Sequence, residues 1–403
     1  PFHKRALDNS VVYQKHGREK QGNYRQKCKS LPVILQQHNK PKYLAYNFKS
    51  MYDAIIIGAG IAGSYLAQRL GDLDILVIEK ERRIVPRDSG IVSTRFDTLF
   101  GRNLSKKFIK KEITEMKLVS PNNSFFLRSD KTFAYILERE DLLRHLRRVN
   151  IAYEAAKGIT TPKDKVTVLT DKGEYESKLV VGADGANSVV KRALGIRQKK
   201  IFVGLMERTG KIKQSTISVH FNKQYSKEFF AWIIPENQEY GTISSIRAKK
   251  YLDAFRKDMQ LPAGETHAYP IPINYTRSFG LRSLLLGDAC GQVKPLTGGG
   301  IIFSMRAAAV AEKTIKEALG KNRFDEALLS RYERAWKMEF GLEIKKQLIV
   351  RNIYSKLGNK DVDKIFKDFG STIEKISDFD YDHFTKVWPQ LPKAKLIRFA
   401  ITK

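Results

Sequence analysis

The sequence contains few cysteines and no long apolar run. Cys28 and Cys290 are the only cysteines among 403 residues, which excludes a disulfide framework or a cysteine-rich zinc site and fits a reducing compartment. The seven histidines include no pair at metal-ligand spacing, so the sequence predicts no metal site. The apolar segments at Ala54–Ala62 and Leu284–Leu286 have only the length of buried strands. The sequence therefore predicts a chain that does not span a membrane.

Acidic residues are scarce relative to basic ones. The chain has 73 Lys and Arg against 43 Asp and Glu, a formal net charge of +30. Such an excess fits a solvated surface, an anionic lipid or phosphorylated ligand, or nucleic acid. Nucleic acid is the least favoured partner, because the basic residues are mostly interleaved with acids, as in Lys364–Asp368, and no nucleic-acid motif occurs.

Residues 1–50 have little hydrophobic periodicity. They carry eleven Lys and Arg against two acids, Asp8 and Glu19, and so +9 of the net charge. A composition of this kind does not easily offset the entropy cost of ordering the chain. The first methionine is Met51, directly before the apolar stretch YDAIII. We interpret Met51 as the natural start, and residues 1–50 as a disordered basic extension or a misassigned reading frame.

A glycine fingerprint lies between a predicted strand and a predicted helix. Asp53–Ile57 is typical of a buried parallel strand, and the apolar spacing after Gly60 is typical of a helix. Gly58, Gly60 and Gly63 form the pattern G-x-G-x-x-G. The first glycine permits a tight turn, the second lets the backbone approach a pyrophosphate, and the third lets the helix pack closely. The free amides at the helix start favour the phosphates.

A second predicted strand ends in a carboxylate at the spacing that a dinucleotide site requires. Asp74–Ile78 leads into Glu79, 21 residues past Gly58. A carboxylate there accepts hydrogen bonds from the adenosine ribose and repels a 2′-phosphate. We therefore expect one set of residues to hold the adenylate half of a dinucleotide: Gly58, Gly60, Ile61, Ala62, Gly63, Glu79 and Lys80.

Two further glycine and aspartate motifs follow buried strands. In the stretch Lys178–Gly195, the strand around Leu179–Val181 leads into a sharp turn at Asp184-Gly185, and a helix begins near Ser188. Further along, the strand Leu284–Leu286 ends in Gly287-Asp288. A loop with Pro295 then leads to three glycines, Gly298, Gly299 and Gly300, and to a helix that we expect from Ile301 to about Leu319.

The ordered set G-x-G-x-x-G, GADG-x-x-S and GDA followed by P-x-TGGGI resembles the flavoprotein group of aromatic hydroxylases, flavin halogenases and geranylgeranyl reductases. The resemblance implies FAD, with Asp288 on the ribityl hydroxyls and Gly299, Gly300 and Ile301 capping the pyrimidine end of the flavin. A reduced flavin is an anion near N1, which a helix start stabilises. The group also has an arginine before a helix, matched by Arg139. The remaining expected FAD contacts are Ser89, Gly90, Asp184, Gly185, Pro295 and Gly298.

Three softer patterns resemble the geranylgeranyl reductase branch. FFAWIIP at Phe229–Pro235 matches an aromatic-x-Trp-x-Phe-Pro motif, with Ile234 in place of the phenylalanine, but it also resembles a halogenase W-x-W-x-I-P motif. VPRDSGIVS has Ser89 before glycine where the branch has cysteine, so any mechanism that needs this thiol is in doubt. Leu328–Ile344 carries the spaced aromatics of its C-terminal helix. The expected substrate-pocket residues are Phe230, Trp232 and Pro235.

The expected fold class is α/β, with a Rossmann-type FAD-binding domain, an inserted antiparallel-sheet substrate domain and a C-terminal helical segment. We expect the FAD-binding domain at 51–83, 133–200 and 270–320, the substrate domain at 84–132 and 201–269, and the helical region at 321–403.

The resemblance implies an FAD-dependent reductase that saturates C=C bonds of geranylgeranyl chains, in a membrane-lipid precursor, by hydride transfer from flavin N5. The expected partners are an isoprenoid lipid and an electron donor, either a ferredoxin-like protein or NAD(P)H. We expect a cytoplasmic location with peripheral contact to the inner face of an anionic membrane. No catalytic residue is assigned. The alternatives are a flavin monooxygenase, a halogenase whose lysine could be Lys106, Lys107 or Lys110, and a lipid-binding protein without turnover.

A chain that begins at Met51 is expected to fold and to bind flavin as the full chain does, because residues 1–50 carry no part of the predicted core. The measurement compares flavin content and thermal unfolding of the two purified chains. Loss of folding in the shorter chain would contradict the interpretation.

Overall fold

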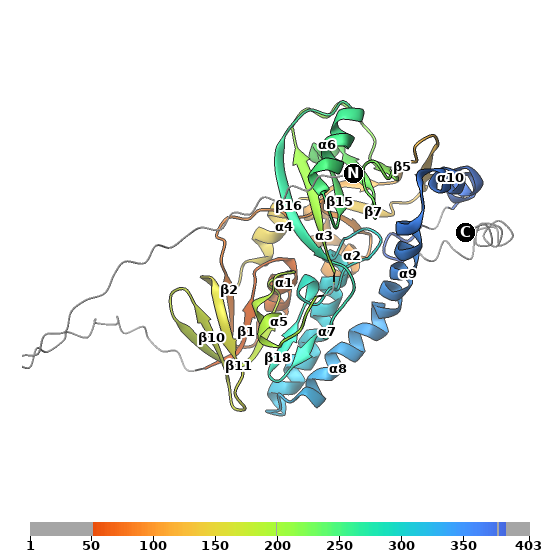
Figure 1. Ribbon diagram of the computed structural model, residues 1–403. Helices are drawn as coiled ribbons and strands as arrows, with labels where there is room; N and C mark the ends of the chain where they lie inside the picture. The colour runs from red at the N-terminus through yellow and green to blue at the C-terminus, as the bar shows by residue number, and fades with distance from the viewer. Residues whose placement is uncertain (1–50, 199, 377–378, 384–403) are drawn as a thin grey trace, which may run out of the picture. The chain divides into compact units, whose positions relative to one another are not determined.

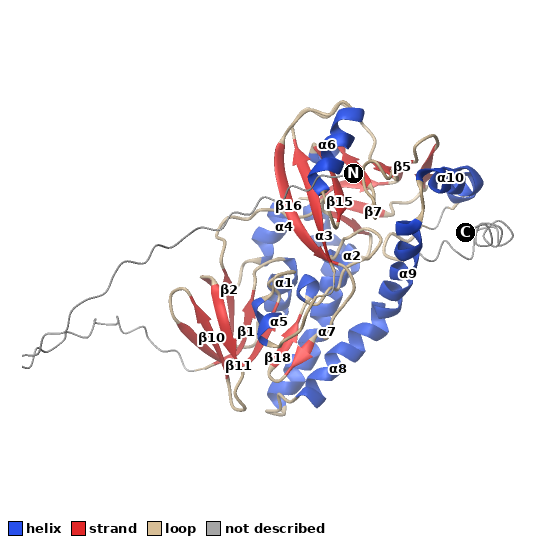
Figure 2. Ribbon diagram, viewed as in Figure 1, coloured by secondary structure: helices blue, strands red, loops and turns tan. Residues whose placement is uncertain are grey.

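The computed structural model describes residues 51–198, 200–376 and 379–383 (Figures 1 and 2). The expectation of disorder for residues 1–50 lies outside these ranges. Two large β-sheets and a series of C-terminal helices organise the described residues. No helix within them combines the length and the apolar composition needed to cross a bilayer.

The first sheet has eight strands and a parallel centre. Its parallel strands lie side by side in the order β8 (Ile151–Tyr153), β2 (Ile75–Glu79), β1 (Tyr52–Ile57), β11 (Glu174–Gly182) and β18 (Ser283–Leu285). Strand β17 (Phe279–Gly280) adds an antiparallel edge, and the antiparallel pair β10 (Val166–Thr170) and β9 (Ala156–Thr160) extends β11. From β1 the chain goes to β2 on one side and later to β11 on the other. The strand order therefore reverses at β1, where ligands of open α/β sheets bind.

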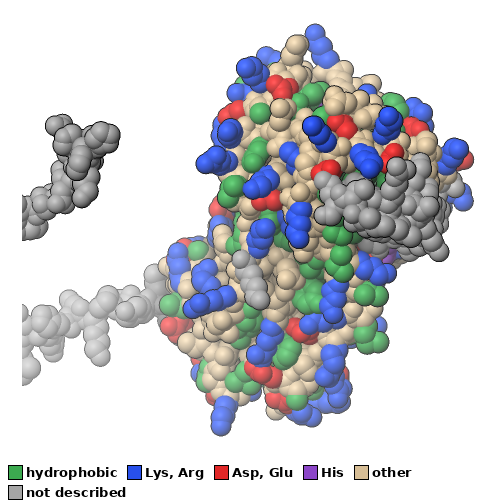
Figure 3. Space-filling view, turned by 45° about the vertical axis from the view of Figure 1, so that its right-hand side comes forward, with side chains coloured by type: hydrophobic (Ala, Val, Ile, Leu, Met, Phe, Trp, Pro, Cys, Tyr) green, Lys and Arg blue, Asp and Glu red, His purple; other side chains and the backbone are tan. Residues whose placement is uncertain are grey.

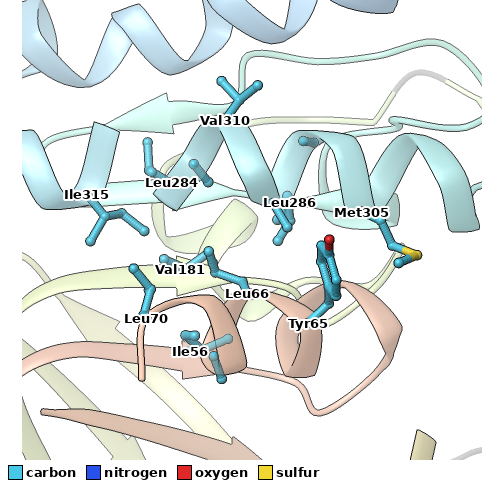
Figure 4. Close-up of a cluster of buried hydrophobic side chains, with 14 of the residues drawn as sticks. Ile56, Tyr65, Leu66, Leu70, Val181, Leu284, Leu286, Met305, Val310 and Ile315 are labelled. Atoms are coloured by element: carbon cyan, nitrogen blue, oxygen red, sulfur yellow. The ribbon is translucent and has the colours of Figure 1, made fainter. Parts of the chain in front are cut away.

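Alternate residues of these strands pack on opposite faces. Ile56 and Val181 face a large core formed with α1 (Ile61–Arg69) and α7 (Ile301–Gly320). Figure 4 shows Leu66 of α1 and Met305 of α7 in this core. Helix α4 (Arg139–Leu146) also packs against α1. The neighbouring residues Ile55 and Val180 face the opposite side, where α5 (Val189–Ala193) lies. Burial on both faces explains why these strands are continuous apolar runs.

The second sheet has seven strands in the order β16 (Glu265–Pro272), β12 (Ile201–Arg208), β15 (Glu239–Ser244), β14 (Ala231–Ile234), β13 (Ser218–His220), β5 (Glu115–Val119) and β6 (Ser124–Arg128). All pairs are antiparallel except β13 with β5. One face carries Trp232, Ile243 and Ile271, which share a core with Val293 from the loop after β18. Helix α6 (Ala248–Asp258) covers part of the other face.

A third, three-stranded sheet and two short helices are formed by residues between β2 and α4. Strand β7 (Ala134–Leu137) pairs with β3 (Ile91–Ser93) and β4 (Ile109–Ile113), and α2 (Phe96–Phe100) and α3 (Arg102–Ser105) connect β3 to β4. Strand β7 comes from the expected FAD-binding segment 133–200, whereas its partners come from 84–132. Strand β16 likewise crosses the expected boundary at 269/270. The division into domains stays a prediction.

The C-terminal helices form a continuous rod followed by a separate helix (Figure 1). Helix α8 (Glu326–Trp336) packs along α7 and passes through a π-helical turn at Lys337–Gly341 into α9 (Leu342–Lys356). Helix α10 (Asn359–Glu374) packs against β6. The predicted fold class is confirmed: a Rossmann-type sheet, a second and mainly antiparallel sheet, and a C-terminal helical segment.

The turn between β1 and α1 is packed too tightly to accept a side chain at Gly63. A methyl group there would lie 2.0 Å from the carbonyl oxygen of Gly58, whereas one at Gly60 would have no atom within 4 Å. We expect Gly63→Ala to lower the free energy of unfolding of the flavin-free protein by about 1–3 kcal/mol. Gly60→Ala is the matched control and should leave it nearly unchanged. Urea unfolding measures both, and equal stability of the two variants would contradict this packing.

Candidate functional site

Three loops meet at the carboxyl ends of the parallel strands. The glycine turn after β1 touches the loop after β11, because a methyl group on Gly58 would lie 2.5 Å from the carbonyl oxygen of Ala183. The loop after β18 touches α1, because a methyl group on Gly287 would lie 3.3 Å from the Cβ of Ala62. The amide of Leu286 donates to the carbonyl of Gly182 at 2.8 Å. The three motifs found in the sequence therefore form one continuous edge.

The first of these loops has a carboxylate at one end and open backbone at its centre. Glu79 accepts hydrogen bonds from the amides of Ala59 at 2.8 Å and Glu81 at 2.9 Å. Arg147 donates to the carbonyl of Ala59 at 2.9 Å, and its Nη2 lies 3.8 Å from Glu79. Gly60 faces open space. A ligand can therefore approach this backbone closely, with a carboxylate at hand for its hydroxyls.

The other predicted residues of this half lie next to the loop. Ile61 and Ala62 are half-buried and pack against the large core. Lys80 is exposed and follows Glu79. Arg147 was not predicted, since an arginine after a helix gives no signal in the sequence.

The loop after β11 contains a buried acceptor without a donor. Asp184 accepts from the amide of Val189 at 2.6 Å through Oδ2, while its Oδ1 has no hydrogen-bond partner within the described ranges. Burial raises the pKa of Asp184, against its hydrogen bonds. Gly185 has φ +76 and no atom within 4 Å of a methyl group built there. The loop is therefore shaped to receive a donor from outside the chain.

The carboxylate of Asp288 lies next to Gly300, the residue that precedes α7. Its Oδ1 would be 3.2 Å from a methyl group built on Gly300, and no hydrogen bond to this carboxylate occurs within the described residues. Burial, with a smaller contribution from Asp88, raises the pKa of Asp288 to about 6, against the attraction of Lys191. A partly buried carboxylate without donors is suited to accept hydrogen bonds from hydroxyl groups of a ligand.

The start of α7 points its free amides toward the same edge. Gly300 precedes the helix without a side-chain cap, and no acid occurs in its first turn. Gly298, with φ +74, packs against Ile243 and Ile271 of the second sheet, and Pro295 is buried in the loop before it. The helix is 20 residues long, so its first amides form a favourable place for partial negative charge.

A buried ion pair between Lys294 and Asp382 connects this loop to the segment 379–383. Lys294 Nζ lies 3.1 Å from Asp382 Oδ1, and the side chain of Lys294 passes 3.4 Å from a methyl group built on Gly299. Asp382 also accepts from the hydroxyl of Ser93. The segment 379–383 near the end of the chain therefore fixes the three-glycine loop, which the sequence did not predict.

Arg139 lies between the loop before β3 and the second sheet. Its side chain packs against Gly90, with Cδ 2.7 Å from a methyl group built there. Its Nη1 lies 3.7 Å from Asp88 and has no hydrogen-bond partner in the described part of the chain, and its Nη2 lies 3.9 Å from Glu239. Ser89 is half-buried and accepts from Asn237 through its carbonyl at 2.8 Å. A buried guanidinium with a free donor is suited to an anionic or carbonyl-rich ligand.

The face of the second sheet that turns toward the site is apolar with one charged pair. Trp232 lies over Gly241, where a methyl group would be 2.4 Å from Cζ2, and its Nε1 is 3.3 Å from Glu239. Glu239 is fully buried, and Arg208 Nε lies 3.3 Å from it. Burial raises the pKa of Glu239, against Arg139 and Arg208.

The other two predicted pocket residues lie directly before and directly after β14, the strand of Trp232. The rings of Phe230 and Trp232 have centroids 6.3 Å apart, and Pro235 is buried directly after β14. Phe230 and Trp232 therefore form a ring pair, and the role of all three residues as a substrate pocket stays a prediction.

Tyr269 is a candidate proton donor on this face. Its ring covers Gly204, where a methyl group would lie 2.5 Å from Cε2, and Ile271, two residues along the strand, contacts Gly298. No hydrogen bond to its hydroxyl occurs among the residues that the structure describes. Burial, followed by the nearby Glu239 and Asp88, raises the pKa of Tyr269, so the phenol stays protonated at neutral pH.

Several polar residues of the site were missed in the sequence. Asp88, Arg208, Glu239, Tyr269, Lys294 and Asp382 are scattered over strands and loops without a motif. A charged residue inside an apolar strand, as Glu239 is before YGTIS, was the one available signal. No cluster of His, Cys, Asp and Glu suited to a metal occurs within the described ranges.

Curated sequence relatives cover most of the chain. No protein-family model matches the chain. The digeranylgeranylglycerophospholipid reductase 2 of Methanothermobacter thermautotrophicus is 27% identical over 378 residues, which cover 84% of this chain and 97% of that protein. The digeranylgeranylglycerophospholipid reductase of Methanococcus vannielii is 28% identical over 364 residues, covering 81% and 92%.

Solved structures share the fold. A geranylgeranyl bacteriochlorophyll reductase-like protein from Thermoplasma acidophilum superposes with a TM-score of 0.75 at 20% identity, over 87% of this chain and 99% of that one. The halogenase PltM, solved in complex with FAD, has a TM-score of 0.62 at 16% identity, over 80% of each chain. The fold is that of the Rossmann-type FAD-dependent oxidoreductases. The predicted resemblance to the geranylgeranyl reductases is confirmed by the sequence relatives.

The raised pKa of Asp288 predicts that the free energy of unfolding of the flavin-free protein falls as the pH rises. A folded-state pKa of about 6 above the ordinary value of 3.8 means that the folded chain binds this proton more tightly than the unfolded chain. Its stabilising contribution is therefore present below about pH 4 and is lost as the pH rises through about 6. As the pH rises from about 4 to above about 6, the free energy of unfolding of wild type should fall by about 2–3 kcal/mol relative to that of Asp288→Asn. Urea unfolding of both proteins at low and neutral pH measures this, and a difference that does not vary with pH would contradict it.

Proposed function

We propose that the chain is an FAD-dependent reductase that saturates isolated C=C bonds in geranylgeranyl chains of a membrane-lipid precursor. The observation that carries the proposal is the juxtaposition of two surfaces. The edge formed by the three glycine and aspartate loops lies against the aromatic face of the second sheet, through the contact of Gly298 with Ile243 and Ile271. The names of the sequence relatives support the reductase activity and its lipid substrate.

The residues at this edge fit FAD along its whole length. Glu79 would accept from the adenosine ribose, and the open backbone at Gly60 would receive the pyrophosphate. Asp288 would accept from the ribityl hydroxyls, and the amides at the start of α7 would face the pyrimidine end of the flavin. The unpaired Asp184 Oδ1 and Arg139 Nη1 are a free acceptor and a free donor at the same edge.

The chain's own residues determine how an alkene is presented and protonated. Bound FAD, once reduced, supplies a hydride from N5. An isolated alkene is not polarised, so the protein must hold it closely and exclude water. Trp232, fixed by Gly241 and Glu239, and the neighbouring Pro235 form an apolar wall for this purpose. We assign proton donation to the Tyr269 hydroxyl, which lies on the same face and keeps its proton at neutral pH.

A thiol is not part of this proposal. Ser89 stands where the related branch has a cysteine. Cys290 is buried on the opposite face of the first sheet, and its thiol donates to the carbonyl of Leu285 at 3.3 Å. Burial raises the pKa of the Cys290 thiol. Cys28 lies outside the described residues.

The lysines that left a halogenase open in the sequence do not favour it. Lys106, Lys107 and Lys110 are all exposed to solvent. The halogenase fold also superposes less well, with a TM-score of 0.62 against 0.75 for the reductase-like protein. These observations leave reduction as the better supported chemistry.

The test is anaerobic incubation of the dithionite-reduced protein with digeranylgeranylglycerophospholipid, followed by mass spectrometry of the lipid. Dithionite makes the result independent of the natural electron donor. We expect a mass gain of two hydrogens for each double bond reduced. An unchanged lipid with a fully flavin-loaded wild-type protein would overturn the proposal, as would oxygen-dependent insertion of an oxygen or halogen atom.

Two variants sharpen this experiment. Gly60→Ala should remain folded but lose FAD and with it the activity, because its methyl group would occupy the space for the pyrophosphate. Tyr269→Phe should retain FAD and slow turnover by about tenfold to a thousandfold, because it removes a positioned acid. Equal turnover by Tyr269→Phe and wild type would exclude this tyrosine as the donor and leave the reductase proposal intact.

A further inference from the structure

Helix α9 buries three polar side chains beside Ile344 and exposes three large apolar side chains. Its buried side chains include Glu343, Gln347 and Arg351. Its exposed side chains include Leu342, Ile349 and Ile353, with 62%, 61% and 47% of their surface accessible. A helix on the surface of a water-soluble protein normally has the opposite arrangement. Exposed apolar side chains that gather on one side of a helix are typical of an interaction surface.

The inward polar side is held by specific contacts near the proposed site. Gln347 accepts from the amide of Leu296, in the loop before the three glycines, at 3.4 Å, and donates to the carbonyl of Asp382 at 3.1 Å. The guanidinium of Arg351 lies 4.2 Å from the ring centroid of Phe202 and 4.4 Å from that of Phe229. Burial lowers its pKa to about 10. These contacts fix the rotation of α9 about its axis, so its apolar side cannot turn inward.

The outward side is a continuous stripe with basic residues beside it. Met338, which is 87% exposed, precedes Leu342 by one helical turn, and Ile349 precedes Ile353 by one turn. At 3.6 residues per turn Leu342, Ile349 and Ile353 lie on one side of α9, and Met338 is exposed in the π-helical turn that precedes it. Lys345, Lys346 and Lys356 lie on the same side and are exposed. None of these three lysines forms an ion pair within the described ranges. We call Met338, Leu342, Ile349, Ile353 and these lysines the α9 stripe.

The charge of the stripe favours an anionic partner over a second copy of the chain. The face of the protein in Figure 3 has more Lys and Arg than Asp and Glu side chains on its described surface. Two copies joined through the stripe would bring lysines against lysines in a protein of net charge +30. An anionic bilayer instead attracts the lysines and receives the apolar side chains between its headgroups.

We propose that the α9 stripe is the surface by which the protein lies on an anionic lipid membrane. The proposal deepens the proposed function and rests on it for its purpose, because a geranylgeranyl lipid must be taken from a bilayer. The helix that would touch the membrane also holds the loop before α7 through Gln347. It reaches the aromatic strand through Tyr354, whose hydroxyl donates to the carbonyl of Phe229 at 2.9 Å. Helix α9 would thus contact the membrane on one side and the loop before α7 on the other.

The experiment is vesicle flotation of the full flavin-loaded protein with vesicles of phosphatidylglycerol and phosphatidylcholine, and with vesicles of phosphatidylcholine alone. Wild type should float with the anionic vesicles and much less with the neutral ones. Leu342→Asn with Ile349→Asn and Ile353→Asn should lower partitioning by about a hundredfold. Lys345→Glu with Lys346→Glu should lower it by at least about tenfold, more strongly at low than at high salt. Unchanged flavin absorbance and thermal unfolding show that these exposed replacements leave the fold intact.

Matched controls replace exposed residues elsewhere. Lys211→Glu with Lys213→Glu makes the same change of charge, and Leu169→Asn with Ile246→Asn removes apolar side chains that are 45% and 52% exposed. Both controls should bind vesicles like wild type. Loss of binding in the controls as large as in the stripe variants would overturn the proposal, since general charge or hydrophobicity would then suffice. It would equally be overturned if the stripe variants floated normally but changed a dimer to a monomer in sedimentation. Vesicle binding needs no turnover, so its failure is distinct from failure of the reductase activity.

Discussion

The close contact between backbone segments at the carboxyl edge of the first sheet positions most of the proposed site. Gly58 has no room for a side chain against Ala183, and Gly63 has none against the carbonyl of Gly58. These contacts bring the turn after β1 against the loop after β11, and the hydrogen bond from Leu286 to Gly182 brings the loop after β18 to the same edge. Three segments that are far apart in sequence therefore present amides and carboxylates along one edge, where we propose that one elongated ligand binds.

Burial of charge provides the second constraint. Arg139 Nη1 lies 3.7 Å from Asp88, in the loop before β3, and its Nη2 lies 3.9 Å from Glu239 of the second sheet. Neither contact is a short ion pair, and Arg139 Nη1 has no hydrogen-bond partner within the described ranges. A buried guanidinium left in this state is costly unless a ligand completes its shell. The same holds for Asp184 and Asp288. The polar groups at the edge are thus arranged for an occupied site.

The fold could be predicted from the sequence because it is encoded in local patterns, and the same patterns carry the proposed cofactor half of the site. A strand, a glycine turn and the start of a helix occur together in one short window at Asp53–Gly63, where we propose that the phosphates bind. The aromatic strand around Trp232 was likewise predicted from seven residues. By contrast, Glu239, Tyr269 and Asp382 reach the site through strand pairing and through the return of the chain end, which no short window contains. The outward apolar side of α9 was also missed, since its period is helical and only packing shows which side is buried.

The central claim is that these three loops bind one extended dinucleotide at both its adenosine end and its flavin end. Fluorescence titration of the flavin-free protein with FAD and with FMN tests it most directly. Glu79 and the open backbone at Gly60 serve the half of FAD that FMN lacks, so FAD should bind once per chain and far more tightly than FMN. Equal affinity for FAD and FMN, or no binding of either, would contradict the account.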